Sequence, residues 1–318
     1  MLKQQIYRNR VKTVFIVIIF LLIYTVVVGA FGYFVTEDIE KGIVLGLLVG
    51  GIYALYTLAR SKSNVLKMSS GREIKHKSRA PQLWNIVEEM SLASGIPMPR
   101  IYIVDSFVPN AFVAGLSRKR VAVGVTQGLL DILNREEIEA VIAHEFAHIQ
   151  NNDMVLSTII ASFVASVTFI SMLRYDRIIK LKALKNGGSK GKGNGYLMLG
   201  VFIIIMMGAI FTKMSQLSLS RNREYLADAT AIDITRNPEG LRQALLKINK
   251  QVHKKQGYGS HVYGYSVKGR PYTQGVDERM AGLYFVNPLT AWDEDERDSV
   301  WQTHPNTYNR VKRIDKMM

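Results

Sequence analysis

The sequence predicts a mainly helical chain with a small β-sheet, held in a membrane by about four hydrophobic helices. Hydrophobic residues make up 48% of the 318 positions, which is too apolar for a disordered chain and slightly rich for a soluble protein. Uncharged runs of helix length occur in two pairs, and the segment between the pairs contains both helix-like and strand-like patterns. These observations favour a membrane-anchored protein with a folded domain outside the bilayer.

The chain contains no cysteine. This excludes a disulfide framework, a cysteine-ligated zinc finger, an iron–sulfur cluster and a cysteine nucleophile. A bound metal ion would therefore need ligands from His, Asp or Glu. The histidines are His76, His144, His148, His253, His261 and His304.

The net charge of +15 is typical of proteins that bind nucleic acid or an anionic membrane surface. The basic residues gather beside the hydrophobic runs, so anionic lipids of a bilayer explain the charge without a nucleic-acid partner. We therefore expect a lipid bilayer as a partner and no nucleic acid.

Four stretches without a charged residue are each 18 to 24 residues long. They are Thr13–Thr36, Gly42–Ala59, Met154–Leu173 and Gly193–Thr212. A bilayer core about 30 Å thick needs about 20 helical residues, so all four can span a membrane. The alternative, a buried helix of a soluble core, is weaker for the first pair than for the second. A cleaved signal peptide is disfavoured, because the first run is too long and a second run follows at once.

The distribution of Lys and Arg predicts the orientation of the first pair. The first twelve residues are basic, the link at residues 37–41 is mostly acidic, and the segment after residue 60 is basic again. We therefore place the N-terminus and residues 60–153 in the cytoplasm. The loop between the third and fourth runs is also strongly basic, so either the first pair dominates the orientation or the second pair does not fully cross.

The pattern divides the chain into four parts. Residues 1–60 form an N-terminal transmembrane hairpin, 61–153 a folded subdomain, 154–215 a second hydrophobic helical hairpin with a basic loop, and 216–318 a C-terminal part of the folded domain. The Gly- and Tyr-rich segment 253–282 carries no assignment.

Local patterns predict the elements of the folded subdomain. We expect a helix at 81–93, a strand at 100–105, a hairpin of 110–114 with 120–125, and a short helix at 126–133. Asn134 then caps a longer helix, with Glu137 as its capping-box partner.

This longer helix carries the strongest motif of the chain, the sequence HEFAH. His144 and His148 lie one turn apart on the same helical face, so both imidazoles can reach one tetrahedral zinc ion, with Glu145 beside the open position. The alternative is an exposed polar helix face without a metal.

Two histidines are too few for a catalytic zinc site, which usually has three protein ligands. The acidic candidate is Glu224 in the sequence SRNREYLAD, with Asp228 one turn further along the same face. This spacing suits one carboxylate on the metal and one that orients a histidine. Alternatively, the two residues are an ordinary acidic pair on a solvated helix.

The motifs HEFAH and SRNREYLAD, together with Thr303-His304-Pro305 and Arg310, resemble the HtpX membrane metalloproteases. These are gluzincin zinc peptidases and relatives of the CAAX prenyl proteases. The resemblance covers nearly the whole chain.

The resemblance implies a zincin-like metalloprotease domain with one Zn²⁺ per chain. His144, His148 and Glu224 are its expected ligands, and Glu145 is its general base. It also implies a multi-pass protein of the bacterial inner or plasma membrane that acts in membrane-protein quality control and stress response.

The resemblance further implies that Asn110, Ala111 and Phe112 belong to an edge strand that pairs with substrate, and that His304 faces the cleft. We expect zinc and a hydrogen bond from His304 to stabilise the oxyanion. Arg310, which we place in the substrate site, is the second choice for this hydrogen-bond donor. Pairing through the backbone selects few side chains, so cleavage should be broad. A turn role for Asn110 and a structural role for His304 remain alternatives.

Five residues separate His148 from Met154, where the third hydrophobic run begins. If the helix continues, the zinc ion lies within about 9 Å of the bilayer boundary, and Asn151, Asn152 and Asp153 mark that boundary. We therefore expect an endopeptidase for membrane or unfolded proteins at the cytoplasmic face. The alternatives are a processing peptidase of the CAAX type and a basic membrane scaffold without activity.

Overall fold

The structure, a computed structural model, describes residues 70–159, 221–253, 266–267, 270–271, 285–286 and 305–318, with isolated positions between residues 11 and 66. His304 lies outside the described residues, and so does most of the predicted hydrophobic hairpin at 154–215. The expectation of a mainly helical chain with a small β-sheet is confirmed.

The sheet has four strands in the order β1-β2-β4-β3. They are β1 (Gly71–Ile74), β2 (Arg100–Val104), β3 (Ala111–Gly115) and β4 (Val121–Thr126). β2 and β4 run parallel, whereas the other two pairs are antiparallel. The predicted strand after residue 100 and the predicted hairpin are confirmed, and β3 is an edge strand.

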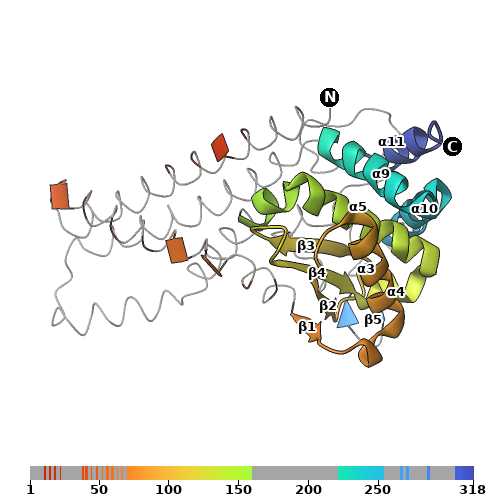
Figure 1. Ribbon diagram of the computed structural model, residues 1–318, viewed down its shortest axis with the longest axis horizontal. Helices are drawn as coiled ribbons and strands as arrows, with labels where there is room; N and C mark the ends of the chain where they lie inside the picture. Colours follow the sequence, from red (N-terminus) through yellow and green to blue (C-terminus); the bar gives the residue numbers. More distant parts are fainter. Residues whose placement is uncertain are drawn as a thin grey trace.

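Helices cover one face of this sheet (Figure 1). α3 (Pro81–Ser94) begins with proline and ends at Gly95, whose φ of 68° is in the left-handed region that glycine tolerates. A short 3₁₀ helix, η1 (Lys77–Arg79), precedes it. The short helix predicted at 126–133 is α4 (Gln127–Ile132), and Thr126 lies just before it as its side-chain cap.

The central helix of the fold is α5 (Arg135–Asn151), which carries the HEFAH motif. The side chain of Asn134 accepts from the backbone N–H of Glu137, and the Glu137 side chain accepts from the backbone N–H of Asn134, each at 2.9 Å. The predicted capping box is confirmed. Lys247 from a later helix also contacts Glu137, at 2.6 Å, so the start of α5 is held from two directions.

α5 does not continue straight into the third hydrophobic run, which corrects the sequence expectation. Asn152 has φ 59° and ψ 21°, a left-handed conformation that ends the helix, and residues 153–159 are helical again. Asn151 and Asp153 are 4% and 6% exposed. Two of the three residues expected to mark the bilayer boundary are therefore buried against the rest of the protein.

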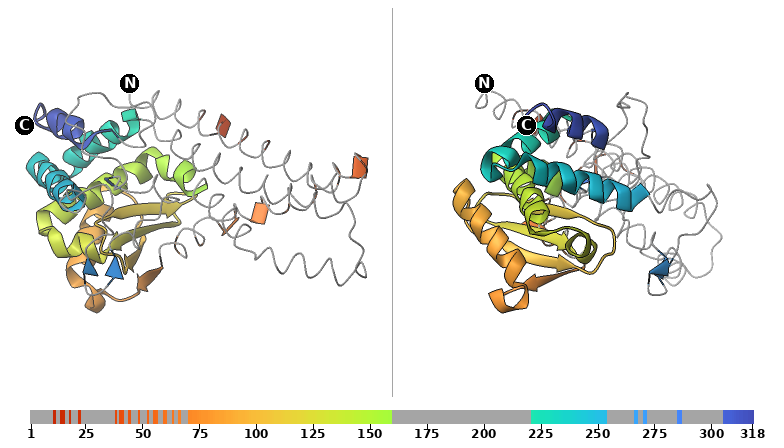
Figure 2. Two further views of the ribbon diagram at one scale, coloured as in Figure 1. Left: turned by 180° about the vertical axis from the view of Figure 1, so that it is seen from behind. Right: turned by 90° about the vertical axis from the view of Figure 1, so that its right-hand side faces the viewer.

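α9 (Arg221–Thr235), α10 (Pro238–His253) and α11 (Thr307–Ile314) form the layer beyond α5. The right-hand view of Figure 2 shows α5 between the sheet and these helices, with α11 outermost. One hydrophobic core joins α3, the sheet, α5 and this outer layer. A two-residue ladder, β5 (Ser266–Val267) with β6 (Arg270–Pro271), completes the described elements.

Within the described part of the chain, no helix combines the length and apolar character needed to cross a membrane. The isolated helical positions near the N-terminus include Val14, Phe15, Ile18 and Leu22, whose side chains are 50% to 63% exposed.

We expect Asn134→Ala to lower the free energy of unfolding by about 1 kcal/mol, because it removes the cap that fixes the start of α5. Chemical denaturation followed by circular dichroism measures this change. Asn134→Asp keeps an acceptor oxygen and serves as the control, since its stability should stay close to that of the parent. Equal losses for both substitutions would contradict a capping role.

Candidate metal centre

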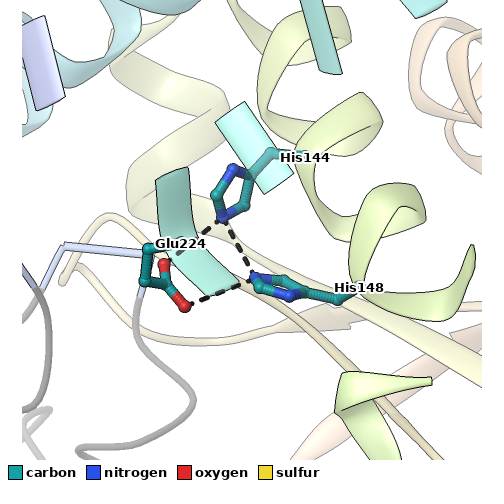
Figure 3. A group of neighbouring side chains, drawn as sticks. All are labelled: His144, His148 and Glu224. Atoms are coloured by element: carbon teal, nitrogen blue, oxygen red, sulfur yellow. Dashed lines mark hydrogen bonds and ion pairs between the residues drawn. The ribbon is translucent and has the colours of Figure 1, made fainter. Parts of the chain in front are cut away.

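The two motif histidines point the same ring nitrogen into one space. His144 and His148 lie one turn apart on α5, and their Nε2 atoms are 3.1 Å apart (Figure 3). His144 is 1% exposed and His148 14% exposed on the side-chain scale. The placement agrees with two imidazoles that share one ion.

Glu224 reaches the same space from α9. Its Oε2 lies 3.6 Å from Nε2 of His144, and its Oε1 lies 3.7 Å from Nε2 of His148 (Figure 3). α9 packs along α5, so a residue 76 positions after His148 meets the motif through helix packing. The structure thus brings the three expected ligands together.

The three side chains fit a tetrahedral zinc ion. Donors bound at about 2.0 to 2.1 Å in tetrahedral directions stand about 3.3 Å from one another. The measured separations of 3.1, 3.6 and 3.7 Å lie on both sides of that value. Two nitrogens and a carboxylate oxygen are also a donor set that zinc prefers.

Asp228 holds the first histidine from behind. Its Oδ1 is 2.9 Å from Nδ1 of His144, which places a proton on Nδ1 and leaves Nε2 as the donor for a metal. Burial acts to raise the pKa of Asp228, but Arg310 and His144 together hold it below its usual value. Asp228 therefore occupies the orienting position expected from its spacing.

Arg310 lies on the far side of Asp228, deep in the protein. Its Nε and Nη2 donate to the two carboxylate oxygens of Asp228 at 2.9 and 2.6 Å, and its Nη1 donates to the carbonyl of Phe285 at 2.8 Å. The residue is 1% exposed. This position differs from the expected substrate or oxyanion contact, because the guanidinium faces the Nδ1 side of His144, away from the Nε2 atoms.

Glu145 follows His144 on α5 and is 4% exposed. Burial raises its pKa to about 7, although the charges of His148 and His144 act in the opposite direction. Burial also acts to lower the pKa of His148, but Glu224 and Asp153 raise it to about 9. A carboxylate that titrates near neutral pH is suited to accepting and returning a proton.

The predicted substrate strand begins beside this network. Asn110 is 4% exposed, and its Oδ1 accepts from the backbone N–H of Phe285 at 2.8 Å. Its backbone is tied to the Thr126 hydroxyl. Ala111 and Phe112 are the first two residues of β3 and are buried, so their side chains serve the core and only the strand backbone is suited to pairing.

The ring of Phe112 covers Gly124 on the neighbouring strand. A Cβ atom at position 124 would lie 2.4 Å from this ring, which no real contact allows. We expect Gly124→Ala to destabilise the fold by about 1 to 3 kcal/mol through overpacking. Phe112→Leu should restore part of this loss in the double variant, as measured by denaturant unfolding. Additive effects of the two substitutions would contradict the contact.

Two residues near the metal centre were not anticipated from the sequence. Phe285 packs edge-on against the His144 ring, with ring centroids 4.9 Å apart, and no motif marks it. Asp153 lies 3.6 Å from Nδ1 of His148. Asp153 follows His148 by five positions. This spacing would suggest a partner for His148 only if the helix is known to end at Asn152.

Comparison with known proteins agrees with this arrangement. The family model described as "Peptidase family M48" matches residues 77–318. A "Protease HtpX homolog" of Listeria innocua serovar 6a is 37% identical over 325 residues, and one of Lactobacillus helveticus is 34% identical over 321 residues. Both alignments cover 100% of each chain.

The solved structure of S. mikatae Ste24p is similar with a TM-score of 0.47 and 16% identity. The match covers 99% of this chain and 66% of that protein, so the chain spans about two thirds of its length.

Proposed function

Because the chain belongs to peptidase family M48 and is therefore a metalloprotease, we propose that it is a membrane-anchored zinc endopeptidase. In this proposal it hydrolyses peptide bonds of membrane or unfolded proteins at the cytoplasmic face of a bacterial inner membrane. The role in membrane-protein quality control and stress response follows from the resemblance to the HtpX proteases.

The observation that carries the proposal is the convergence of His144, His148 and Glu224 from two helices onto one point. The donor types and their separations suit zinc, and Asp228 fixes the tautomer of one histidine. When bound, zinc would polarise the scissile carbonyl and make water acidic enough to attack near neutral pH.

Glu145 is the proton carrier in this proposal. Its carboxylate takes a proton from the attacking water and later passes it to the leaving amine. Its position directly after His144, buried beside the three converging donors, supports this role. His304 stays the proposed oxyanion donor, whereas the buried contacts of Arg310 favour a role in holding Asp228 and His144.

β3 supports an extended substrate. It is the last strand of the sheet, so a peptide can add to its outer edge through backbone hydrogen bonds. The buried side chains of Ala111 and Phe112 leave little side-chain selection on this strand, which agrees with cleavage of many sequences.

Exposed apolar side chains at the described N-terminal positions support membrane anchoring. Val14, Phe15, Ile18 and Leu22 recur at helical spacing and are at least half exposed. Isolated exposed apolar residues are ordinary, but a stripe of them within an uncharged run is typical of contact with lipid.

The test of this proposal is metal removal from the purified full chain. Extraction with a strong chelator should abolish cleavage of an unfolded protein, and about one equivalent of zinc per chain should restore it. Metal analysis and a gel-based cleavage assay measure the two quantities. Undiminished cleavage after complete extraction would contradict the zinc mechanism.

Two substrate comparisons test the finer assignments. One substrate in membrane-inserted and soluble forms should be cleaved faster when inserted, and equal rates would contradict a site at the lipid boundary. A prenylated peptide cleaved in preference to unfolded protein would favour the CAAX-type alternative.

A further inference from the structure

The turn after the motif helix brings a second carboxylate to the metal centre. Asn152 ends α5 in the left-handed conformation, and its N–H contacts the carbonyls of His148 and Ile149. The left-handed residue interrupts the helix, and Asp153 is the first residue of the helical segment that follows it. Its side chain is 7% exposed.

Asp153 faces the ring nitrogen of His148 that points away from the metal position. The distance from Oδ2 of Asp153 to Nδ1 of His148 is 3.6 Å, slightly longer than a hydrogen bond. Among the described residues, both atoms are buried and have no hydrogen-bond partner. Buried polar atoms are normally paired, so each of these two atoms is the natural partner of the other.

Arg223 supplies the opposite charge to Asp153. Its Nη1 lies 3.9 Å from Oδ1 of Asp153, and both side chains are less than one tenth exposed. Arg223 directly precedes the ligand Glu224 on α9. One helix thus provides a metal ligand and a cation for the carboxylate beside another ligand.

The same order of groups occurs behind the first histidine. Asp228 contacts Nδ1 of His144, and Arg310 binds Asp228. A carboxylate on the outer nitrogen of a metal-bound histidine fixes its tautomer and raises its affinity for the metal. We propose that Asp153 positions the zinc ligand His148 as Asp228 positions His144, and that Arg223 holds Asp153 in place.

This inference rests on the proposed function, since it assigns a role toward zinc. The competing explanation is that Asp153 only begins the helical segment at 153–159, where an acidic side chain stabilises the helix start. The two explanations differ in what they predict, because a helix start affects stability and an orienting group affects metal affinity.

The experiment measures the zinc dissociation constant of the full chain by competition with a chromophoric chelator. Asp153→Asn and Asp153→Ala should each weaken zinc binding, by about 10-fold to 100-fold, with Ala the weaker binder. Asp228→Asn gives the scale for the first histidine. Asp233→Asn, at an exposed position of α9, is the matched control and should bind zinc like the parent.

Thermal unfolding of the metal-free variants separates the two explanations. Unchanged zinc affinity with a lowered Tm would overturn the positioning role. Asp153 would then only stabilise the start of the helical segment at 153–159. If both quantities fall for the Asp153 variants, Arg223→Gln decides, because it leaves Asp153 present. It should also weaken zinc binding, and parental affinity in that variant would overturn the proposal.

The outcomes also distinguish the inference from the proposed function. A parent chain that binds no zinc would contradict the proposed function itself. A parent that binds zinc no more tightly than the Asp153 variants would contradict only the role of Asp153.

Discussion

Replacing Glu145 by glutamine should lower kcat by about 10²-fold to 10⁴-fold, the usual contribution of a positioned general base. The amide has the size of the carboxylate but cannot take a proton from water. Since Glu145 is not one of the three converging donors, zinc content should stay at the parental level. Steady-state cleavage of an unfolded protein and metal analysis of the same sample measure both quantities.

The matched control for this variant is Glu136→Gln in the first turn of the same helix, outside the metal centre. It should keep parental kcat and zinc content. Retention of substantial activity by Glu145→Gln would contradict the proposed mechanism. Loss of zinc in that variant would instead indicate that Glu145 is a metal ligand.

Replacing Arg310 by methionine should lower the free energy of unfolding by about 3 to 5 kcal/mol, since it leaves the Asp228 carboxylate buried without its cation. Arg310 and Asp228 are both nearly inaccessible to solvent, and two hydrogen bonds join them. The carbonyl of Phe285 would lose a donor as well. Denaturant unfolding of the metal-free chain measures the change.

Arg242→Met provides the comparison for Arg310→Met. Arg242 pairs with Asp315 at 2.8 Å on the surface, where such pairs contribute about 0 to 1 kcal/mol. The double variant Arg310→Met with Asp228→Leu should recover part of the stability, because no unpaired charge is then left buried, although the carbonyl of Phe285 and Nδ1 of His144 still lose their partners. Equal losses for the Arg310 and Arg242 variants would contradict the buried pair.

Short-range patterns predicted the elements around the metal centre well. Three of these features depend only on residues that are close in the sequence. They are the capping box of Asn134 and Glu137, the hairpin before it, and the shared helical face of His144 and His148. Glu224 could be chosen because the sequence SRNREYLAD places it one turn before Asp228 and the HEFAH motif calls for a third ligand. These features need no knowledge of the tertiary fold.

Long-range packing decided what the sequence left open. No local sequence pattern predicts that β2 pairs in parallel with β4 or that β1 lies at the other edge of the sheet, because both depend on how distant segments pack. Arg310 and Asp228 are 82 positions apart, so the direction of the guanidinium depends on how α11 docks. Asn has only a modest tendency to end helices. The left-handed conformation of Asn152 therefore could not be predicted from its residue type.

An unbroken series of hydrogen bonds runs from the start of β3 to the first histidine. Asn110 accepts from Phe285, Phe285 accepts from Arg310, and Arg310 binds the carboxylate that contacts His144. In the proposed reaction, a peptide paired with β3 would thus lie next to a strand that is connected by hydrogen bonds to the residues that orient His144. If substrate pairs with β3 as proposed, we expect substitutions along this series to change both substrate binding and the orientation of His144.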